Sequence, residues 1–330
     1  MNKDLQRIPC FLYEEGVHFA LPPALKGLRR VYSRFVLRSE DRCLIPEPTT
    51  FRAVNRPEDA QVFLFPLDLG VYTDSGAATD MGRIVGDLPY FAGRERRHIC
   101  SDAGDRPTTI PQPASIFATS VLRNGPRNVI PTAYVLPEHS RAQEASFDWR
   151  AIRYDVSFVG NATHPVRRAL ITSIRREAPQ LRLLVDFDTS VVTGDTVCRH
   201  LAQSPEEQQR RQAMFCRSLR TSYCVLCPPG LGPQSIRFYE TLHAGRIPVL
   251  IDNDSVLPLE KNIDYKAFCC RIPRTHVAHA GQFLASWLAG QTRAALRERC
   301  ILACRTGNTW FSDARHNAAL MRIILQPGEA

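Results

Sequence analysis

Strand-like and helix-like segments alternate through the second half of the chain, and this alternation limits the possible folds more than any other feature. Strands that alternate with helices are joined by right-handed crossovers and lie parallel in one sheet. Residues 151–330 are therefore predicted to form an α/β domain, with a helical tail over residues 277–325. The predicted strands are residues 153–160, 181–187, 222–227 and 247–251, and the predicted helices are residues 166–177, 206–220 and 235–244.

Shorter strands, separated by prolines, are predicted in the first half at residues 60–69, 98–102 and 128–136. The polar stretch from residue 137 to 150 has neither helical nor strand periodicity, so it is predicted to link the two halves. A chain of 330 residues is long enough for two domains. We therefore expect residues 1–150 and residues 151–330 to form two α/β domains.

The composition is that of a folded protein, with 44% hydrophobic and 23% charged residues. The formal net charge is +9, and arginine supplies most of the positive charge. Because the arginine fork suits phosphate oxygens, a nucleotide or an anionic membrane surface is a candidate partner. The arginines are scattered rather than gathered in one basic run, and this argues against nucleic acid as a partner.

Cysteine usage bears on the compartment of the protein. The chain has eleven cysteines, and its first residues, MNKDLQRIPC, lack the apolar segment of a secretory signal. Free thiols and a cytoplasmic location are therefore expected, and no apolar run is long enough to cross a bilayer. Cys224 and Cys227 form a C-x-x-C pair inside a strand-like run, which favours buried thiols over zinc or redox chemistry.

A Gly/Pro loop, PPGLGP, follows the predicted strand at 222–227 and precedes a predicted helix that begins near Ser235. Ligands of parallel sheets bind at the carboxyl ends of strands, where Gly230 and Gly232 would let the backbone approach a pyrophosphate closely. Arg237 would bind phosphate oxygens, and Glu240, on the same helical face, would accept hydrogen bonds from ribose hydroxyls. The alternative is an Arg–Glu ion pair on a solvated face, but the mostly apolar residues around the pair favour a ligand.

A second stretch of this type, FVGNATHPVRRAL, places Gly160 after a strand and Arg167 at the start of a helix. Arginine is disfavoured at that end of the helix dipole, so a phosphate counter-ion is expected there, with an ordinary solvated turn as the alternative. In the first half, Asp102 ends a predicted strand and is a candidate general base for an acceptor hydroxyl. Asp68 is its rival, and simple turn chemistry is the other interpretation of Asp102.

Two further stretches, LLVDFD and VLIDND, each place a D-x-D pair after an apolar strand. Such acids, at Asp186 and Asp252, could hold Mn²⁺ or Mg²⁺ against a diphosphate. The motif occurs twice in the chain, so either copy alone is a less specific indication of a metal site. A divalent metal is possible here but is not favoured.

The segment from Ser222 to Pro258 resembles the signature of the exostosin-type glycosyltransferases, glycosyltransferase family 47. Residues 58–68, 88–104 and 154–170 show weaker similarity to other parts of the sequence pattern of this family. The chain departs from the family pattern in having Arg97 and Ser101 in place of Asp and His, and Thr241 and Arg246 in place of Ala and Cys. The matching residues are Pro228, Gly230, Ser235, Arg237, Glu240, Gly245, Pro248, Asp252, Leu257 and Pro258.

The resemblance implies the GT-B fold, in which two Rossmann-like domains face each other across a cleft. It also implies a nucleotide-sugar donor held mainly by the second domain, inversion at the anomeric carbon, and terminal helices that pack back on the first domain. We therefore expect a cytoplasmic inverting glycosyltransferase that moves a sugar from a UDP-sugar to a hydroxyl of a glycan or other acceptor. Its basic surface would allow peripheral contact with an anionic membrane. No cofactor beyond the donor is expected. Gly160, Arg167, Gly230, Gly232, Ser235, Arg237 and Glu240 would bind the donor, and Asp102 would be the base.

Two alternatives to this function stay open at this point. A metal-dependent transferase would use the D-x-D acids at Asp186 or Asp252. A non-catalytic carbohydrate-binding relative is suggested by the departures at Arg97 and Ser101.

Overall fold

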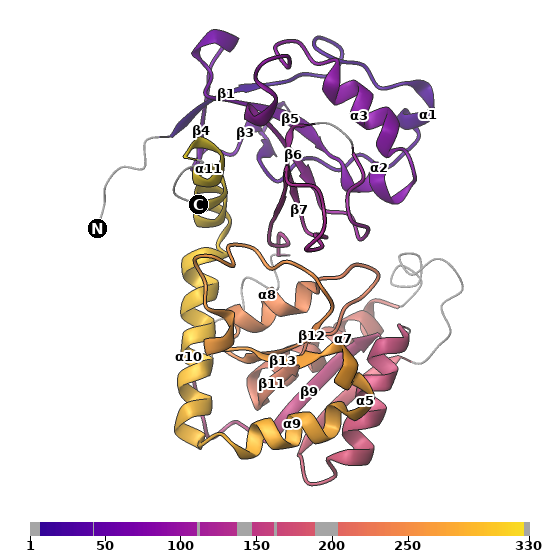
Figure 1. Cartoon of the computed structure of the whole chain (residues 1–330), viewed down its shortest axis with the longest axis vertical. Helices are drawn as coiled ribbons and strands as arrows, with labels where there is room; N and C mark the ends of the chain where they lie inside the picture. Colours follow the sequence, from indigo (N-terminus) through magenta and orange to yellow (C-terminus); the bar gives the residue numbers. More distant parts are fainter. Residues whose placement is uncertain are drawn as a thin grey trace. The chain divides into compact units, whose positions relative to one another are not determined.

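The computed structural model describes residues 7–41, 43–110, 113–136, 147–161, 164–188 and 204–326. Most of the predicted linker therefore lies outside the described residues. The chain separates into two compact units, each assembled from more than one segment (Figure 1). Unit 1 comprises Met1–Val135, Asp254–Lys261 and Trp310–Ala330, and unit 2 comprises Leu136–Asn253 and Asn262–Thr309. A single division at residue 150 thus describes only the main part of each unit.

Within the described residues, unit 1 holds a parallel sheet with the strand order β4-β1-β5-β6-β7-β8. The predicted strands at 60–69 and 98–102 are confirmed, whereas the one predicted at 128–136 ends at Pro131. The strands are β1 (Ile8–Leu12), β4 (Phe51–Ala53), β5 (Val62–Asp68), β6 (His98–Asp102), β7 (Ser115–Ala118) and β8 (Val129–Pro131), and a hairpin joins β2 (Val36–Arg38) to β3 (Leu44–Pro46). The helices are α1 (Pro23–Lys26), α2 (Gly70–Asp74), α3 (Ala78–Gly86) and the 3-10 turns η1 (Pro57–Asp59) and η2 (Glu95–Arg97).

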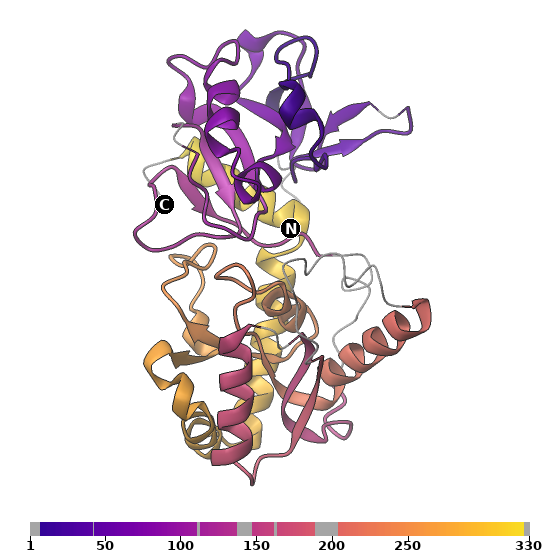
Figure 2. The same cartoon turned by 90° about the vertical axis from the view of Figure 1, so that its right-hand side faces the viewer.

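The alternating side chains of β5 divide the core of unit 1 between the two faces of the sheet. Phe63 and Phe65 belong to one apolar cluster, together with residues of α2 and α3. Val62 and Leu64 belong to the other, which also contains Leu320 and Met321. These last two residues come from α11 (Asp313–Leu325), so the C-terminal helix packs on the sheet of unit 1 (Figure 1, Figure 2).

Buried polar groups also hold α11 in unit 1. His316 is fully buried, and its Nε2 accepts a hydrogen bond from the backbone N–H of Ala133 at 3.0 Å. Its other nitrogen, Nδ1, therefore carries the proton and donates to the carbonyl of Trp310 at 2.9 Å. The guanidinium of Arg34 donates from Nε to Asn317 Oδ1 at 3.1 Å. Each of these buried polar groups has a partner, so the helix is fixed in one register.

Unit 2 contains, among its described residues, a second parallel sheet with the order β10-β9-β11-β12-β13. The α/β alternation predicted from the sequence is confirmed here, element by element. The strands are β9 (Tyr154–Asn161), β10 (Leu183–Asp188), β11 (Ser222–Leu226), β12 (Ile247–Asp252) and β13 (Cys270–Pro273). The helices are α5 (Pro165–Glu177), α7 (Pro205–Thr221), α8 (Ile236–His243), α9 (Ala280–Ala289) and α10 (Arg293–Trp310), with 3-10 turns η3 (Tyr265–Ala267) and η4 (Arg274–His279).

Local sequence explains where these helices begin. Proline occupies the first turn of α5 and of α7, where a missing N–H costs nothing. Ser204 caps α7 by accepting a hydrogen bond from the N–H of Glu207 at 3.3 Å, which is half of a capping box. The cap of α5 is unusual, because the ring nitrogen Nδ1 of His164 accepts from the N–H of Val166 at 3.3 Å.

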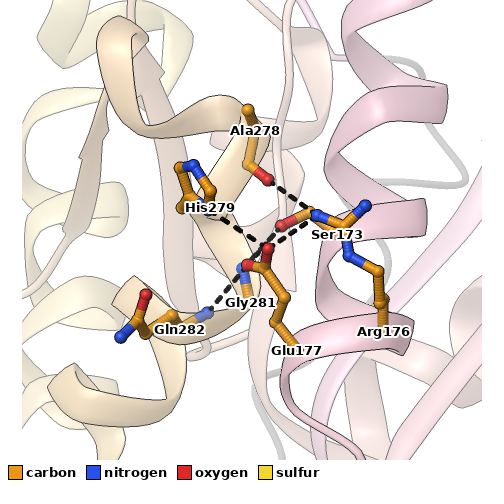
Figure 3. Close-up of polar contacts among 7 residues, drawn as sticks. All are labelled: Ser173, Arg176, Glu177, Ala278, His279, Gly281 and Gln282. Carbon is orange, nitrogen blue, oxygen red and sulfur yellow. Dashed lines mark hydrogen bonds and ion pairs between the residues drawn. The ribbon is translucent and has the colours of Figure 1, made fainter.

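A network around Glu177 joins the end of α5 to the start of α9 (Figure 3). Its Oε2 accepts from Ser173 Oγ at 2.9 Å and from the N–H of Gln282 at 3.4 Å, so a carboxylate faces the first turn of α9. Its Oε1 accepts from Arg176 at 2.6 Å. The two helices approach closely at Gly281, where a Cβ would lie 2.5 Å from the carbonyl oxygen of Ser173.

All the cysteines of the described residues are free thiols, and Cys224 and Cys227 are buried at β11, as the sequence predicted. Burial raises the pKa of the Cys227 thiol to about 12, so it is not a reactive thiolate. No helix in the described part of the chain is both long and apolar enough to cross a membrane.

Candidate functional site

The topology of unit 2 identifies one place in its sheet as the natural binding site. From β9 the chain crosses through α5 to β10 on one side, and it then returns through α7 to β11 on the other side. At such a switch point, the loops at the carboxyl ends of the two central strands diverge and leave a crevice for a ligand. In this chain those loops follow Asn161 of β9 and Leu226 of β11. The N-termini of α5 and α8 follow them.

Arg237, in the first turn of α8, is the central charge at this switch point. Its Nη2 donates to the carbonyl of Val159 at 2.7 Å, and its Cζ lies 4.6 Å from the ring centroid of Phe158. The other two guanidinium nitrogens, Nε and Nη1, are buried and have no hydrogen-bond partner in the described structure. Burial lowers the pKa of Arg237 from its usual value, and the charge of Glu240 offsets this effect only in part.

Gly160, at the end of β9, is what allows Arg237 to lie against this strand. A Cβ at this position would be 2.3 Å from Nη2 of Arg237, a distance that real Cβ atoms do not show. The backbone of Gly160 also has a φ of +153°, which residues with side chains rarely adopt. The structure thus brings together two residues that the sequence predicted separately.

Arg167 ties the two loops of the switch point to each other. Its Nη1 donates to the carbonyl of Asn161 at 2.8 Å, and its Nε donates to the carbonyl of Pro229 at 3.0 Å. Its Nη2 would lie 2.9 Å from a Cβ at Gly230, so this glycine makes room for the arginine. Arg167 therefore holds the glycine loop as well as placing a positive charge beside it.

Ser235 and Gly232 complete the loop before α8, and both are buried. The hydroxyl of Ser235, at the N-cap, accepts no hydrogen bond from the amides of the first turn. The loop is instead fixed by Asn253, whose Nδ2 donates to the carbonyl of Pro233 at 2.8 Å. The helix thus begins without a side-chain cap, an arrangement that suits an anion at its N-terminus.

Glu240 lies one turn further along α8 and is half-buried. It forms no ion pair with Arg237 in the described structure, because that guanidinium turns toward β9. The simple solvated Arg–Glu pair, which was the alternative for these two residues, is therefore not what the chain forms.

Asp102 lies in unit 1, at the carboxyl end of β6, and is only 1% exposed. Its Oδ2 accepts from Thr73 Oγ1 at 2.9 Å, and its Oδ1 accepts from the N–H of Gly104 at 3.0 Å. Burial raises the pKa of its carboxyl above the usual range. The bond from Gly104 is turn chemistry, whereas the bond from Thr73 is a tertiary contact with α2, and the role of Asp102 as a base stays a prediction.

Asp68, the rival of Asp102, ends the neighbouring strand β5 and is also buried. Its Oδ2 accepts from Ser101 Oγ at 2.6 Å, and its Oδ1 accepts from the N–H groups of Gly70 and Ala103 at 2.9 Å. Burial raises the pKa of Asp68 to about 6. Ser101, one of the departures from the family pattern, is thus a hydrogen-bond partner of this acid.

The D-x-D acids face arginines in unit 2. Asp252 Oδ1 accepts from Arg271 at 2.9 Å, and Asp186 lies 3.9 Å from a guanidinium nitrogen of Arg210. Among the described residues no group of three or more His, Cys, Asp or Glu side chains is arranged to hold a metal ion.

Sequence reasoning missed the aromatic neighbours of Arg237. Phe158 is buried in β9, and Phe215 comes from α7, with its ring centroid 5.8 Å from the Cζ of Arg237. Phe158 could have been found, because it lies two residues before Gly160 on the same strand. Nothing in the sequence indicates Phe215, because its contact with Arg237 depends on how α7 packs.

The family model for the Exostosin GT47 domain matches residues 116–287, which is slightly more than half of the chain. This match contains every predicted donor-binding residue but not Asp102 or Asp68. No curated protein is significantly similar in sequence to the chain.

Several solved structures are similar to the chain at low identity. AviGT4, a glycosyltransferase involved in avilamycin A biosynthesis, has a TM-score of 0.40 and 13% identity, with 82% of this chain and 83% of that chain covered. HepE of Anabaena, solved with UDP and glucose, has a TM-score of 0.42 and 11% identity, with 80% and 78% covered. Sucrose-phosphate synthase of Thermosynechococcus elongatus has a TM-score of 0.42 and 11% identity, with 98% and 100% covered.

The α/β fold with its parallel sheets, the signature around α8 and the family match lead to one assignment. The chain belongs to the exostosin family of glycosyltransferases, glycosyltransferase family 47.

Proposed function

We propose that this glycosyltransferase binds a nucleoside diphosphate sugar, with UDP-sugar as the favoured donor, at the switch point of unit 2. The proposal adds that the sugar moves, with inversion, to a hydroxyl of a glycan or other acceptor. One observation carries the proposal. Arg237 has two buried guanidinium nitrogens without a partner, at the place where parallel sheets bind their ligands.

The chemistry of Arg237 points to a phosphate group as its ligand. A buried cation is costly unless an anion pairs with it, and in the described structure this guanidinium contacts a carbonyl and aromatic rings, while Glu240 acts on it through its charge without an ion pair. The amides at the uncapped start of α8 add a second source of positive potential. Two such sources side by side suit the two linked phosphates of a diphosphate. In the proposal Gly160, Arg167, Gly230, Gly232, Ser235 and Arg237 surround the diphosphate, and Glu240 binds the ribose.

The same groups would promote the transfer step. The acceptor oxygen forms a bond to the anomeric carbon while the bond from that carbon to the diphosphate oxygen breaks, and the acceptor proton passes to a base. Negative charge develops on the departing diphosphate. A guanidinium and helix amides that bind the diphosphate would stabilise this charge more in the transition state than in the ground state.

The base is a separate part of the proposal, and Asp102 is its candidate. A carboxylate that accepts a proton works best when its pKa is raised toward the working pH, and burial raises the pKa of Asp102. Its two oxygens already accept from Thr73 and Gly104, so Asp102 would act through the hydroxyl of Thr73 or after that hydroxyl turns away.

We also propose that no metal is needed for donor binding. Asp252 accepts a hydrogen bond from Arg271, and Asp186 faces Arg210, so both D-x-D acids have a cation beside them. The charge of the diphosphate would be neutralised by arginines and helix amides instead.

Calorimetric titration with a panel of UDP-, GDP- and CDP-sugars tests the donor proposal. We expect one nucleotide class to bind, and we expect Arg237→Met to weaken its binding by about tenfold or more, because a charge-assisted hydrogen bond is lost. Glu240→Ala should weaken the binding of nucleotides that carry a ribose. The matched controls are Arg305→Met and Glu298→Ala, which change exposed charges on α10.

Two outcomes would contradict parts of this proposal. The assignment of the site is wrong if none of the nucleoside diphosphate sugars binds. It is also wrong if Arg237→Met binds a nucleoside diphosphate sugar as tightly as the parent chain does. If a donor binds but no sugar is transferred or hydrolysed with any acceptor, the chain is the non-catalytic relative.

A further inference from the structure

The guanidinium of Arg237 lies in a slot formed by four residues of β9 and α7, which we call the arginine slot: Phe158, Val159, Gly160 and Phe215. The ring of Phe158 lies on the inner side, with its centroid 4.6 Å from Cζ, and the ring of Phe215 lies at 5.8 Å. The carbonyl of Val159 accepts from Nη2 at 2.7 Å. Two aromatic rings and one carbonyl thus set the position of the cation.

Gly160 provides the space in this slot. A Cβ on Gly160 would lie 2.3 Å from Nη2, 3.4 Å from Cζ and 3.7 Å from Nη1 of Arg237. A methyl group at this position and the observed guanidinium therefore exclude each other. Nη2 is the atom that the methyl group would displace, and the contacts of the guanidinium with Val159 and Phe158 oppose that movement.

The arginine slot contains no carboxylate, unlike the surroundings of Arg182 and Arg271 in unit 2. Arg182 is bound by Asp155 at 2.7 Å, and Arg271 is bound by Asp252 at 2.9 Å. A carboxylate beside Arg237 would compete with phosphate for the same donors. Aromatic faces attract a guanidinium more weakly and leave its N–H groups available.

We propose that Gly160 and Phe215 are positioning residues for Arg237, and this inference rests on the proposed donor site. They hold the guanidinium beside the glycine loop without a direct ion pair, so that its Nε and Nη1 are reserved for the diphosphate. Both nitrogens are covered in this structure, so binding needs a local rotation of the guanidinium. Phe158 is fully buried, whereas Phe215 is half-buried. The side chain of Phe215 is therefore the one that can move to let the guanidinium rotate.

A double-mutant cycle on stability tests the arginine slot without any ligand. Gly160→Ala is made in the parent chain and in Arg237→Met, and urea unfolding is measured for each. We expect Gly160→Ala to lower the urea midpoint clearly more in the parent chain, because only there does the new methyl group meet a guanidinium. The backbone strain of alanine at this position is the same in both backgrounds and cancels. Equal losses in the two backgrounds would overturn the inference.

The same variants test the link to the donor, with UDP and UMP as probes in calorimetry. We expect Gly160→Ala to weaken UDP binding by about tenfold, as the loss of a charge-assisted hydrogen bond does, and to change UMP binding much less. Phe215→Leu, which keeps bulk but removes the ring face, should act in the same direction more weakly. In the Arg237→Met background neither substitution should weaken UDP binding further. Gly27→Ala is the control, because a Cβ there meets nothing within 4 Å.

The outcomes separate this inference from the proposed function. If the parent chain binds no nucleotide, the proposed function fails, while the stability cycle still decides whether the arginine slot exists. The positioning role is wrong if UDP binds and Gly160→Ala leaves the affinity for UDP unchanged. It is also wrong if Gly160→Ala weakens UDP binding as much in the Arg237→Met background as in the parent chain. In both cases the donor site stands.

Discussion

At the scale of single residues, unit 2 uses two buried arginines in different ways. Arg246 is fully buried, and it donates to the carbonyls of Gly245 at 2.8 Å and Arg220 at 3.0 Å, so it connects the start of β12 to the end of α7. Arg237 has one carbonyl partner and two nitrogens without any. Nε of Arg246 also makes no hydrogen bond in the described structure, but the two bonds from its other nitrogens join two elements of the fold, whereas the two unused donors of Arg237 suit a ligand.

The sequence indicated Arg237 but not the way in which it is held. The apolar neighbours along α8 marked its charge as unusual, and the family signature contains it. The slot that holds it depends on Phe215 of α7 and Gly160 of β9. Such contacts follow from the packing of elements that are distant in sequence, so local patterns cannot predict them.

Asp102 gives a prediction at this scale. We expect Asp102→Asn to lower kcat by about a hundredfold or more if Asp102 takes the acceptor proton, while the dissociation constant of UDP is unchanged. Because the pKa of Asp102 is raised, the activity of the parent chain should rise with pH as this carboxyl loses its proton. Steady-state kinetics measures kcat and calorimetry measures the dissociation constant of UDP, so the two effects can be separated. Asp68→Asn is the matched control, and turnover preserved in Asp102→Asn would leave Asp102 with a structural role only.

At the scale of elements, the second face of the sheet in unit 1 is covered by a helix from the far end of the chain. The periodicity of apolar residues predicted a helix over the C-terminal tail. Its docking depends on pairs such as Arg34 with Asn317 and Ala133 with His316, which are 283 and 183 residues apart. Periodicity shows that a helix has an apolar face, but not which sheet that face covers.

His316 makes the docking of α11 sensitive to pH. Burial and the nearby cation of Arg34 lower the pKa of His316 well below its usual value of 6.5. Below about pH 6.5 the unfolded chain binds a proton that the folded chain does not, so the free energy of unfolding falls as the pH falls. The slope is at most about 1.4 kcal/mol per pH unit for this group.

Urea unfolding between pH 7 and pH 5 measures this slope, and we expect His316→Asn to make it shallower. The comparison of variant with parent removes other groups, such as Asp68. The pKa of Asp68 is raised to about 6, so its contribution changes in the opposite sense, weakening the fold as the pH rises toward that value. An unchanged slope in the variant would show that His316 is not linked to folding.

The junction of α5 and α9 depends on the absence of one side chain. A Cβ on Gly281 would lie 2.5 Å from the carbonyl oxygen of Ser173, whereas one on Gly290, just beyond the same helix, would be 3.6 Å from its nearest neighbour. We expect Gly281→Ala to lower the free energy of unfolding by about 2 kcal/mol, since the two helices must separate. Gly290→Ala should change it by less than about 0.5 kcal/mol. Chemical denaturation of both variants checks this, and equal stabilities would contradict the close packing.

At the scale of the whole molecule, the alternation of strands and helices was enough to predict an α/β class with parallel sheets, because right-handed crossovers permit few other arrangements. It was not enough to assign every segment to a unit. Residues 254–261 and 310–330 belong to unit 1 although they follow most of unit 2. That membership is decided by long-range contacts, such as the backbone hydrogen bond from Arg123 to Asp254 at 3.0 Å.

The last prediction concerns how the whole protein neutralises the charge of its donor. If arginines and helix amides do so, UDP should raise the melting temperature equally with EDTA and with Mn²⁺, and at a hundred times its dissociation constant it should contribute about 2.7 kcal/mol to stability. Asp252→Asn and Asp186→Asn should keep this response, because both acids already face arginines. Arg237→Met should lose most of it. A response that disappears in EDTA, returns with Mn²⁺ and is absent in Asp252→Asn would place a metal ion at the D-x-D acids and would make the arginine site secondary.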